Sequence, residues 1–223
     1  MVFNFDKILL MQDLAQIRKE YTQSELDEKA IAPNPISQFD KWFNEALSAK
    51  VLEANAMNLS TVSSNGRPSS RIVLLKGFNE EGFTFYTNYQ SAKGKELEQT
   101  PFCALSFFWP ELERQVRLEG SVERVSEEQS DIYFKSRPRE SQIGAWASPQ
   151  SSRITSRSLL EERYKSMEKK FEGKDSIGRP NQWGGYLVKP FLIEFWQGRP
   201  SRLHDRIQYT LIDGQWNISR LAP

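Results

Sequence analysis

Hydrophobic residues recur with helical spacing in the first 50 positions of the chain. One set predicts an amphipathic helix between Ile8 and Tyr21: Ile8, Leu9, Leu14, Ile17 and Tyr21. The segment Ala32-Pro-Asn-Pro35 interrupts this pattern, and Ser37 is a candidate N-cap for a second helix. The buried face of that helix would hold Phe39, Trp42, Phe43 and Leu47. Residues 1–50 are therefore predicted to form a helical N-terminal segment.

After Val51 the hydrophobic period shortens to two, which is typical of strands. We expect strands over residues 57–63, 71–78, 83–88, 102–109 and 114–125, and later over 191–197, 207–212 and 215–221. Asn65-Gly66 and Asp213-Gly214 are turn signals between such strands. Ser91 is placed to cap a short helix that ends near Leu97.

A second helical region is expected between residues 126 and 172. Ser126-Glu-Glu-Gln129 fits a capping box, and the charged segment 159–170 fits an exposed helix. A polar loop containing Gly and Pro is expected over 173–185. Because strands come in runs joined by short turns, the predicted fold is mainly β with peripheral helices. It is an antiparallel barrel over residues 51–223, with a helical insertion at 126–172.

Composition then removes several classes of chemistry. The chain has 223 residues, with 30 Lys plus Arg, 29 Asp plus Glu, one Cys and one His. A single Cys and a single His exclude an intramolecular disulfide and a zinc site built from Cys or several His, so no metal is expected, although an all-carboxylate magnesium site stays open. The near-zero net charge favours neither a nucleic-acid nor a membrane partner, and no apolar run approaches 18 residues. We expect a cytoplasmic protein.

The balanced total conceals cationic clusters. Residues 67–76 hold three cations and no acid, and residues 137–157 hold four Arg and one acid. Neither G-x-G-x-x-G nor G-x-x-x-x-G-K-[ST] occurs, so any phosphate would be bound by side chains. In a straight strand Arg71 and Lys76 lie roughly 16 Å apart, which suits two different phosphates. The alternative is that both cations only flank a buried strand.

Two further patterns could carry chemistry. Tyr133, Arg137 and Ser141 are spaced by four, so a helix would gather them into a phosphate clamp, but Pro138 interrupts that helix and a solvated helix face is the alternative. In an extended segment Arg202 and His204 would project to one side, together with Arg206. Two Arg would lower the pKa of the imidazole and favour its neutral form. The alternative is a structural, hydrogen-bonding histidine.

Together these segments resemble the pyridoxamine 5'-phosphate oxidase family. The similarity runs from Arg18-Lys-Glu-Tyr21 to Arg220-Leu-Ala-Pro223. Its most specific blocks are RIVLLK (71–76), FYTN (85–88), LERQV (112–116), SRPRESQIGAW (136–146), QSSRI (150–154), IEFWQG (193–198) and RLHDR (202–206). The resemblance implies an FMN-binding split β-barrel that forms a homodimer, with FMN in the groove between subunits.

The resemblance also implies roles for individual residues. FMN would be bound by Arg71, Ile72, Val73, Leu74, Leu75, Lys76, Tyr86, Thr87, Lys93, Gln115, Gln150, Ser151, Trp196 and Arg206. The substrate phosphate would be bound by Lys76, Tyr133, Arg137 and Ser141. The substrate ring would meet Arg202, Leu203 and His204, with Arg202 and His204 as the catalytic pair. A mobile N-terminal lid would add Arg18, Lys19, Glu20 and Tyr21.

The implied reaction oxidises pyridoxamine 5'-phosphate or pyridoxine 5'-phosphate to pyridoxal 5'-phosphate, with O2 as acceptor. The products would include H2O2, and NH3 from the amine. Two alternatives are a non-catalytic split-barrel protein that binds flavin or pyridoxal phosphate and an RNA-binding barrel, which the charge balance disfavours. The chain departs from the family at Ser91-Ala92-Lys93, where Ser-Arg-Lys or Ser-His-Lys is common. The missing cation places the affinity for FMN in doubt.

Overall fold

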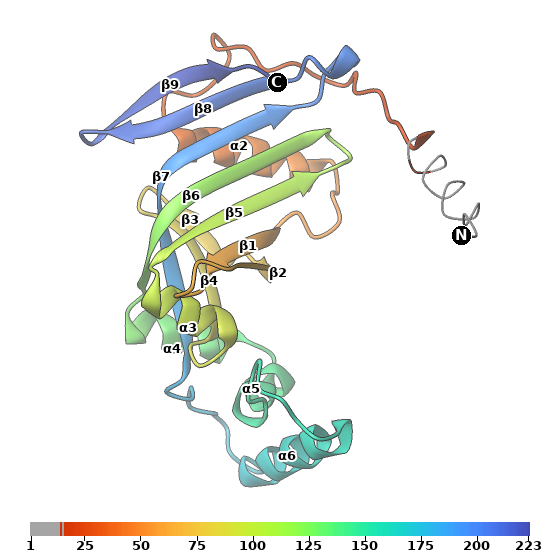
Figure 1. Ribbon diagram of the computed structural model, residues 1–223. Helices are drawn as coiled ribbons and strands as arrows, with labels where there is room; N and C mark the ends of the chain where they lie inside the picture. The colour runs from red at the N-terminus through yellow and green to blue at the C-terminus, as the bar shows by residue number, and fades with distance from the viewer. Residues whose placement is uncertain (1–13, 15) are drawn as a thin grey trace, which may run out of the picture.

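The computed structural model describes residue 14 and residues 16–223. In these residues five α-helices and a short 3-10 helix accompany one nine-stranded antiparallel sheet, with α2 against one face and α3 to α6 gathered at one end (Figure 1). The strands are β1 (Ala56–Val62), β2 (Pro68–Leu74), β3 (Gly77–Asn79), β4 (Gly82–Asn88), β5 (Phe102–Trp109), β6 (Arg114–Arg124), β7 (Trp183–Gln197), β8 (Asp205–Ile212) and β9 (Gln215–Leu221). The helices are α2 (Pro35–Ser48), α3 (Ala92–Gln99), α4 (Glu127–Ser136), α5 (Arg139–Ala147), α6 (Arg157–Lys170) and η1 (Pro200–Arg202).

The sheet curls because its two edges are neighbours in the sequence. Its main path runs β2-β1-β5-β6-β7-β4-β3, so β2 and β3 lie at opposite ends. Only Leu75 and Lys76 separate these two strands. The Leu75 amide donates to Asn55 O beside β1, whereas the Lys76 amide donates to Thr84 O on β4. The chain therefore crosses from one edge to the other, and the predicted single strand 71–78 is wrong at this point.

The long strand β7 divides its partners between its two halves. Residues 183–188 pair with β4 and residues 192–197 pair with β8, while β6 runs along both halves. The β6–β7 register shifts between Glu119 and Gly120, and Pro190 lies opposite Gly120. A Cβ on Gly120 would lie 2.5 Å from Lys189 O, so only glycine fits this irregularity. Because of this bend, the first half of β7 pairs with β4 and the second half pairs with β8.

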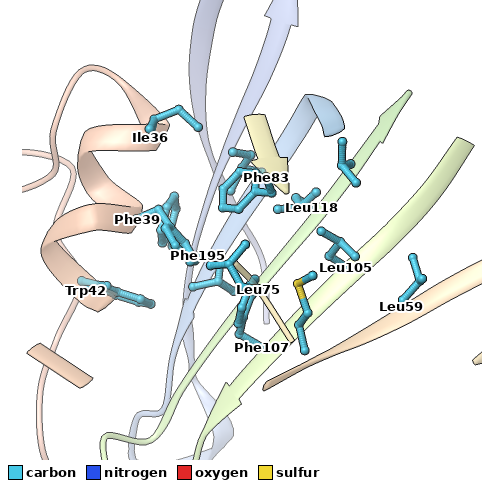
Figure 2. Close-up of a cluster of buried hydrophobic side chains, with 14 of the residues drawn as sticks. Ile36, Phe39, Trp42, Leu59, Leu75, Phe83, Leu105, Phe107, Leu118 and Phe195 are labelled. Atoms are coloured by element: carbon cyan, nitrogen blue, oxygen red, sulfur yellow. The ribbon is translucent and has the colours of Figure 1, made fainter. Parts of the chain in front are cut away.

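The core lies between the concave face of the sheet and α2. Alternate residues of β5 and β6 are buried, including Leu105, Phe107 and Leu118, which gives the predicted strand pattern. Phe39 and Trp42 on α2 point into this layer toward Phe83, Phe195 and Leu75 (Figure 2). A second cluster under α4, α5 and α6 consists of Phe134, Ile143, Phe171, Ile177 and Trp183.

The helical predictions hold in part. Ser91 caps α3 and Ser126 caps α4 by accepting from the third following amide, as expected. The cap of α2 is Asn34 and not Ser37, because Pro35 fixes the first helical turn and lacks an amide hydrogen. Half of the helix expected from Ile8 to Tyr21, residues 8–13 and 15, lies outside the described residues, and the predicted end is wrong, since residues 17–21 are not helical.

The loop expected over 173–185 ends earlier than predicted, because β7 already begins at Trp183. Gly184 and Gly185 belong to the strand. A Cβ on Gly184 would lie 2.1 Å from the Tyr89 hydroxyl, and one on Gly185 would lie 2.7 Å from the Tyr86 ring. These glycines let two tyrosines cross the strand closely, and they do not mark a loop. The division of the chain near residue 50 stays a prediction.

Candidate functional site

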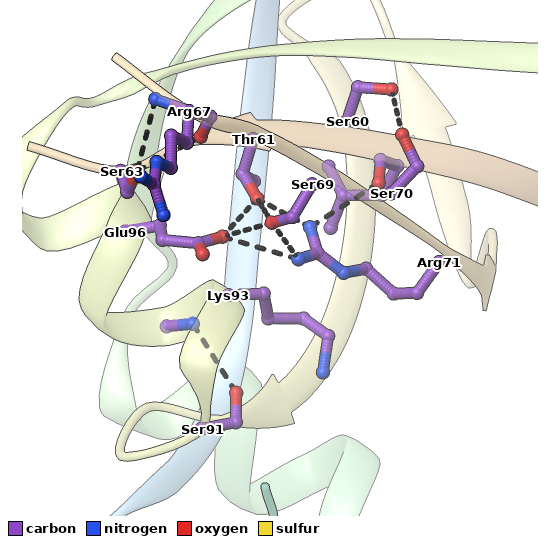
Figure 3. A network of polar contacts seen from close by, with 12 residues as sticks. Ser60, Thr61, Ser63, Arg67, Ser69, Ser70, Arg71, Ser91, Lys93 and Glu96 are labelled. Atoms are coloured by element: carbon purple, nitrogen blue, oxygen red, sulfur yellow. Dashed lines mark hydrogen bonds and ion pairs between the residues drawn. The ribbon is translucent and has the colours of Figure 1, made fainter. Parts of the chain in front are cut away.

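A polar cluster holds Arg71 between β1, β2 and α3 (Figure 3). Its Nη2 donates to Ser69 Oγ at 2.6 Å and lies 3.2 Å from Glu96 Oε2, and its Nη1 donates to the Thr61 hydroxyl. Glu96 also accepts from the hydroxyls of Thr61 and Ser69. Burial alone would raise the pKa of the Glu96 carboxyl, but these donors outweigh it and hold that pKa below its ordinary value. The Arg71 guanidinium is thus held in one orientation.

Lys93 brings a second cation to this cluster from the first turn of α3. Its Nζ lies 3.3 Å from Thr87 Oγ1 and 3.3 Å from Gln150 Oε1. Burial lowers the pKa of the Lys93 ammonium, and the positive charge of Arg71 lowers it further, against the opposing effect of Glu96. A buried ammonium that a neighbouring guanidinium repels gains stability when an anion binds. Four predicted residues, Arg71, Thr87, Lys93 and Gln150, meet at a place suited to a phosphate.

A cavity of about 260 Å³ adjoins this cluster and is lined by Arg137 and Ser141. Gln150 and Asn88 also line the cavity, and Gln150 accepts from Lys93, so the cavity and the cluster share a wall. Within the described part of the chain, Arg137 Nη1 is the one buried side-chain nitrogen or oxygen without a hydrogen-bond partner. Burial lowers the pKa of the Arg137 guanidinium, although nearby Tyr133 acts in the opposite sense. A buried donor without a partner is costly unless a ligand pairs with it.

Aromatic rings fix the orientation of this cavity wall. The rings of Tyr86 and Tyr133 stack at 3.9 Å between centroids, and both lie nearly parallel to the indole of Trp183. The guanidinium carbon of Arg137 lies 4.6 Å from the Trp183 ring centroid. The break at Pro138 gives this arrangement: α4 carries Tyr133, α5 carries Ser141, and Arg137 ends α4 in an extended conformation. A single helix face does not form, yet the three residues gather on the same side.

His204 lies in a second cavity, of about 860 Å³, together with the N-terminal segment. This cavity is lined by Ile17, Arg18, Lys19, Glu20, Tyr21, Arg199, Ser201, Arg202 and His204. The Tyr21 ring packs edge-on against Trp196 at 5.6 Å and against His204 at 5.8 Å. The amide of Arg199 donates to His204 Nδ1 at 3.1 Å. The structure thus brings together the residues predicted for the lid and for the catalytic pair.

The pKa of His204 is lowered, in the predicted direction, but only one of the two predicted arginines, Arg202, contributes, because Arg206 is paired with Glu194. Burial is the first cause and the charge of Arg202 is the second, while Asp205 opposes both. The expected extended segment from Arg202 to Arg206 is wrong. Arg202 sits in the η1 turn with φ 61° and follows Ser201 with φ 57°, and β8 begins only at Asp205. Leu203 is exposed, with 70% of its surface accessible.

Three of the residues predicted to bind the cofactor form a row across adjacent strands. Gln115 on β6 pairs with Trp196 on β7, which in turn pairs with Arg206 on β8. Arg206 donates through Nε to Glu194 Oε1 at 2.7 Å, and Arg117 donates to Glu194 Oε2 at 2.7 Å. Burial raises the pKa of the Glu194 carboxyl, but the two Arg outweigh this effect and lower it overall. This ion-pair network stiffens the face of the sheet opposite the core.

The predicted site residues fall into two groups that are far apart in one chain. The Arg71 and Arg137 group belongs to β2, α3, α4 and α5, at one end of the molecule, whereas His204 lies between η1 and β8 at the other end (Figure 1). Lys76 lies between β2 and β3, beside Leu75 in the core, while Ile72 is exposed. Val73 and Leu74 end β2, and Ser151 occupies a turn with φ 67°. One chain does not complete a site containing both groups.

Sequence reasoning missed four residues that position these groups. Trp183 carries the aromatic stack, Glu96 holds Arg71, Arg199 donates to His204, and Glu113 contacts the N-terminal segment. Trp183, Glu96 and Glu113 contact residues that are distant in the sequence, whereas Arg199 contacts His204, five residues later. The signal for Arg199 was its place beside the Arg202–Arg206 cluster. For Glu113 the signal was its position in the LERQV block.

In residue 14 and residues 16–223, no three His, Cys, Asp or Glu side chains gather closely enough to hold a metal ion. No helix within these residues has the length and apolar character needed to cross a bilayer.

Comparisons with known proteins agree with this geometry. Residues 43–170 match the family model "Pyridoxamine 5'-phosphate oxidase", and residues 183–223 match the model "Pyridoxine 5'-phosphate oxidase C-terminal dimerisation region". A curated pyridoxine/pyridoxamine 5'-phosphate oxidase of Gloeothece citriformis is 56% identical over 95% of this chain and 99% of its own length. The protein of the same name from Burkholderia ambifaria is 55% identical over 96% of this chain and 100% of its own length.

Solved structures show the same architecture. PhzG from Burkholderia lata 383, crystallised with tetrahydrophenazine-1-carboxylic acid, aligns with a TM-score of 0.86 at 26% identity, over 92% of this chain and 100% of its own. A pyridoxamine 5'-phosphate oxidase-related, FMN-binding protein from Nostoc punctiforme aligns with a TM-score of 0.68 at 21% identity, over 87% and 100%. The predicted antiparallel split barrel is confirmed. From its family models and its relatives, this chain belongs to the pyridoxamine 5'-phosphate oxidase family.

Proposed function

We propose that this chain is an FMN-dependent oxidase that converts pyridoxamine 5'-phosphate and pyridoxine 5'-phosphate to pyridoxal 5'-phosphate. The alcohol and O2 give the aldehyde and H2O2. The amine, O2 and water give the aldehyde, NH3 and H2O2. In both cases two electrons and two protons leave the C4' group, with one hydrogen from C4' and one from its hydroxyl or amine, and together they reduce O2 to H2O2. The names of the relatives support this reaction class.

One observation carries the proposal: the buried Arg137 Nη1 without a partner in the cavity that Ser141 lines. A phosphomonoester offers oxygens that can accept from the guanidinium and the Ser141 hydroxyl together. The Tyr133 ring lies nearly parallel to the indole of Trp183, which lines the same cavity. A protein that bound only a flavin would have one phosphate to hold, whereas Arg137 and the Arg71–Lys93 cluster offer two places.

The residues present fit the cofactor. Lys93, with its pKa lowered by burial and by Arg71, would be relieved by a phosphate, and Thr87 and Gln150 lie within reach of the same ammonium. The row of Gln115, Trp196 and Arg206 would face the flavin ring. FMN, when bound, supplies the acceptor for the electron pair removed from C4' and passes that pair to O2.

The protein side of the mechanism is binding, orientation and control of protonation. Because the Arg199 amide donates to Nδ1, the neutral His204 ring carries its proton on Nε2. Burial and Arg202 favour that neutral ring. His204 can therefore donate one hydrogen bond to a substrate oxygen or nitrogen at C4', while Arg202 adds positive charge beside it. Tyr21 covers this position and limits access of water.

The separation of the two groups supports a site shared between subunits. Arg137 of one subunit and His204 of the other would complete one substrate site, so an isologous dimer would hold two. The match of residues 183–223 to a dimerisation region agrees with this arrangement. Coexpression of Arg137→Ala and His204→Ala chains tests it. Heterodimers would contain one intact site, so about a quarter of wild-type activity should return in a statistical mixture of dimers. Activity no greater than that of either variant alone would contradict a shared site.

Oxygen uptake and the flavin spectrum test the reaction itself. Protein reconstituted with FMN should consume O2 and form H2O2 when pyridoxine 5'-phosphate is added. Under anaerobic conditions the yellow absorption should bleach on addition of pyridoxamine 5'-phosphate. A yellow protein that neither bleaches nor takes up O2 would instead be a non-catalytic flavin carrier. Failure to bind FMN at all would contradict the proposal.

A further inference from the structure

Glu113 is a buried carboxylate with no part in the chemistry described above. It ends the turn between β5 and β6 with φ 55°, and its side chain is only 2% exposed. A carboxylate this deeply buried requires several donors to remain ionised. Those donors come from the N-terminal segment, about 90 residues earlier in the sequence.

Three groups of that segment converge on the two oxygens of Glu113. The amides of Thr22 and Gln23 donate to Oε2 at 2.8 Å and 3.1 Å. The ammonium of Lys19 lies 3.2 Å from Oε1. Burial would raise the pKa of the Glu113 carboxyl, but the Gln23 amide, Lys19 and the Thr22 amide outweigh it and lower that pKa overall. The carboxylate is therefore charged and paired at neutral pH.

Tyr21 lies between Lys19 and Thr22, so the same contacts set its place. Its ring meets Trp196 and His204, at 5.6 Å and 5.8 Å between centroids. The ring also approaches Gly198, where an added Cβ would lie 2.6 Å from Tyr21 Cγ. The Gly198 amide donates to Glu113 O at 2.8 Å. Glu113 thus ties together the end of β7, which seats the tyrosine, and the segment that carries it.

We propose that Glu113 is a positioning residue, which clasps residues 19–23 so that Tyr21 stays seated over His204. The consequence for catalysis rests on the proposed function. Glu113 itself touches neither the reacting carbon nor the cofactor row. Its effect passes through the backbone of the segment. The clasp is a charged contact between distant parts of the chain, and it holds residues that line the His204 cavity.

Hydrogen exchange of the full-length holoenzyme tests the clasp directly. In Glu113→Gln, an amide nitrogen replaces one oxygen and the ion pair with Lys19 is lost. We expect the amides of Thr22 and Gln23 to exchange at least about tenfold faster, while those of β5 and β6 keep their rates. Glu111→Gln is the matched control, because Glu111 is an exposed carboxylate in the same turn. Unchanged exchange at 22–23, or an equal rise throughout the sheet, would overturn the proposal.

Kinetics and a second variant complete the test. For Glu113→Gln we expect KM for pyridoxine 5'-phosphate to rise about five- to tenfold with a smaller change in kcat. The reason is that Tyr21, which forms one wall of the His204 cavity, is no longer held in place for substrate binding. Gly198→Ala should displace Tyr21 and give the same KM shift and faster exchange at 22–23, even if Glu113→Gln does not fold. No change in exchange in Gly198→Ala would count against the clasp. If the proposed oxidase activity is wrong, no variant turns over, yet the exchange result stands.

Discussion

The guanidinium of Arg137 lies over the Trp183 ring, with 4.6 Å between its carbon and the ring centroid, and its buried Nη1 has no partner among the described residues. The indole supports the cation from one side, and the adjoining cavity opens beside Ser141. This pairing holds a planar donor ready for an anion. The positions of the two residues in the sequence, 46 apart, give no hint of it.

Arg137→Lys should weaken substrate binding although it keeps the charge. Lysine cannot place a planar guanidinium over the Trp183 ring or donate through two nitrogens at once. Loss of one charge-assisted hydrogen bond costs about 1.5–3 kcal/mol, which corresponds to a roughly 10- to 150-fold rise in KM for pyridoxine 5'-phosphate. Steady-state oxygen uptake measures it. Arg163→Lys, on the exposed face of α6, is the control and should leave KM unchanged.

The elements of this fold were largely predictable because their signals are local. The alternation of hydrophobic residues in Phe102–Trp109 indicates a strand with one buried face. Ser91 and Ser126 cap the helices that follow them. Errors arose where a distant partner decides the conformation. Gly184 and Gly185 look like loop residues until Tyr86 and Tyr89 are known to cross them. The left-handed turn at Ser201 and Arg202 involves no glycine, so nothing in the sequence signals it.

The sequence and its family resemblance suggested candidate site residues, but not how those residues are arranged. The family resemblance supplied Lys93 and Gln150 separately, and only the fold brings residues 57 positions apart within 3.3 Å. The roles of Glu96 and Glu113 were not predicted, because a Glu in a sequence is by default expected to be exposed to solvent. Both are held by donors that the folded chain assembles around them.

Lys93→Met should weaken the binding of FMN and stabilise the protein without FMN. Methionine keeps the length of the side chain but removes a charge whose pKa burial and Arg71 already lower. In the protein without FMN, the substitution removes a buried charge that Arg71 repels, so the folded state becomes more stable. In the complex, the FMN phosphate loses one charged hydrogen-bond donor, so the affinity for FMN falls about 10- to 150-fold. Quenching of flavin fluorescence gives the affinity, and thermal unfolding gives the stability.

The control for that experiment is Lys95→Met, on the exposed side of the same helix. It should change neither quantity appreciably. If Lys93→Met lowered the melting temperature of the FMN-free protein, the ammonium would be stabilising there, against the direction of its pKa.

Protonation of His204 should reduce turnover, and the sole histidine makes its titration directly observable. Burial and then Arg202 lower the pKa of the ring below its ordinary value of 6.5, so the neutral form prevails at pH 7. We expect kcat/KM to be level above that value and to fall as the pH drops through the lowered pKa. The imidazole proton signals in NMR spectra report the same midpoint.

Two substitutions give the sign of the effect. Arg202→Met should raise the pKa of His204 toward 6.5 without reaching it, since burial remains the larger cause. Asp205→Asn should lower it further, because Asp205 stabilises the charged ring. Shifts in the opposite directions would contradict the assignment of these charges.

Gly94→Ala should destabilise the protein, although alanine is the better helix former. A Cβ at this position in α3 would lie 2.2 Å from Tyr89 O and 2.6 Å from its carbonyl carbon, which are backbone atoms that cannot yield easily. The gain in helix propensity is about 1 kcal/mol, and overpacking typically costs 1–3 kcal/mol or more when backbone must move. Gly144→Ala in α5 is the matched control, because nothing lies within 4 Å of its added Cβ. Thermal unfolding should show a lower melting temperature for Gly94→Ala and an unchanged or higher one for Gly144→Ala. Gly94 is then required by its close contact with the Tyr89 backbone, and a stable Gly94→Ala protein would show that α3 can move away from the turn at Tyr89.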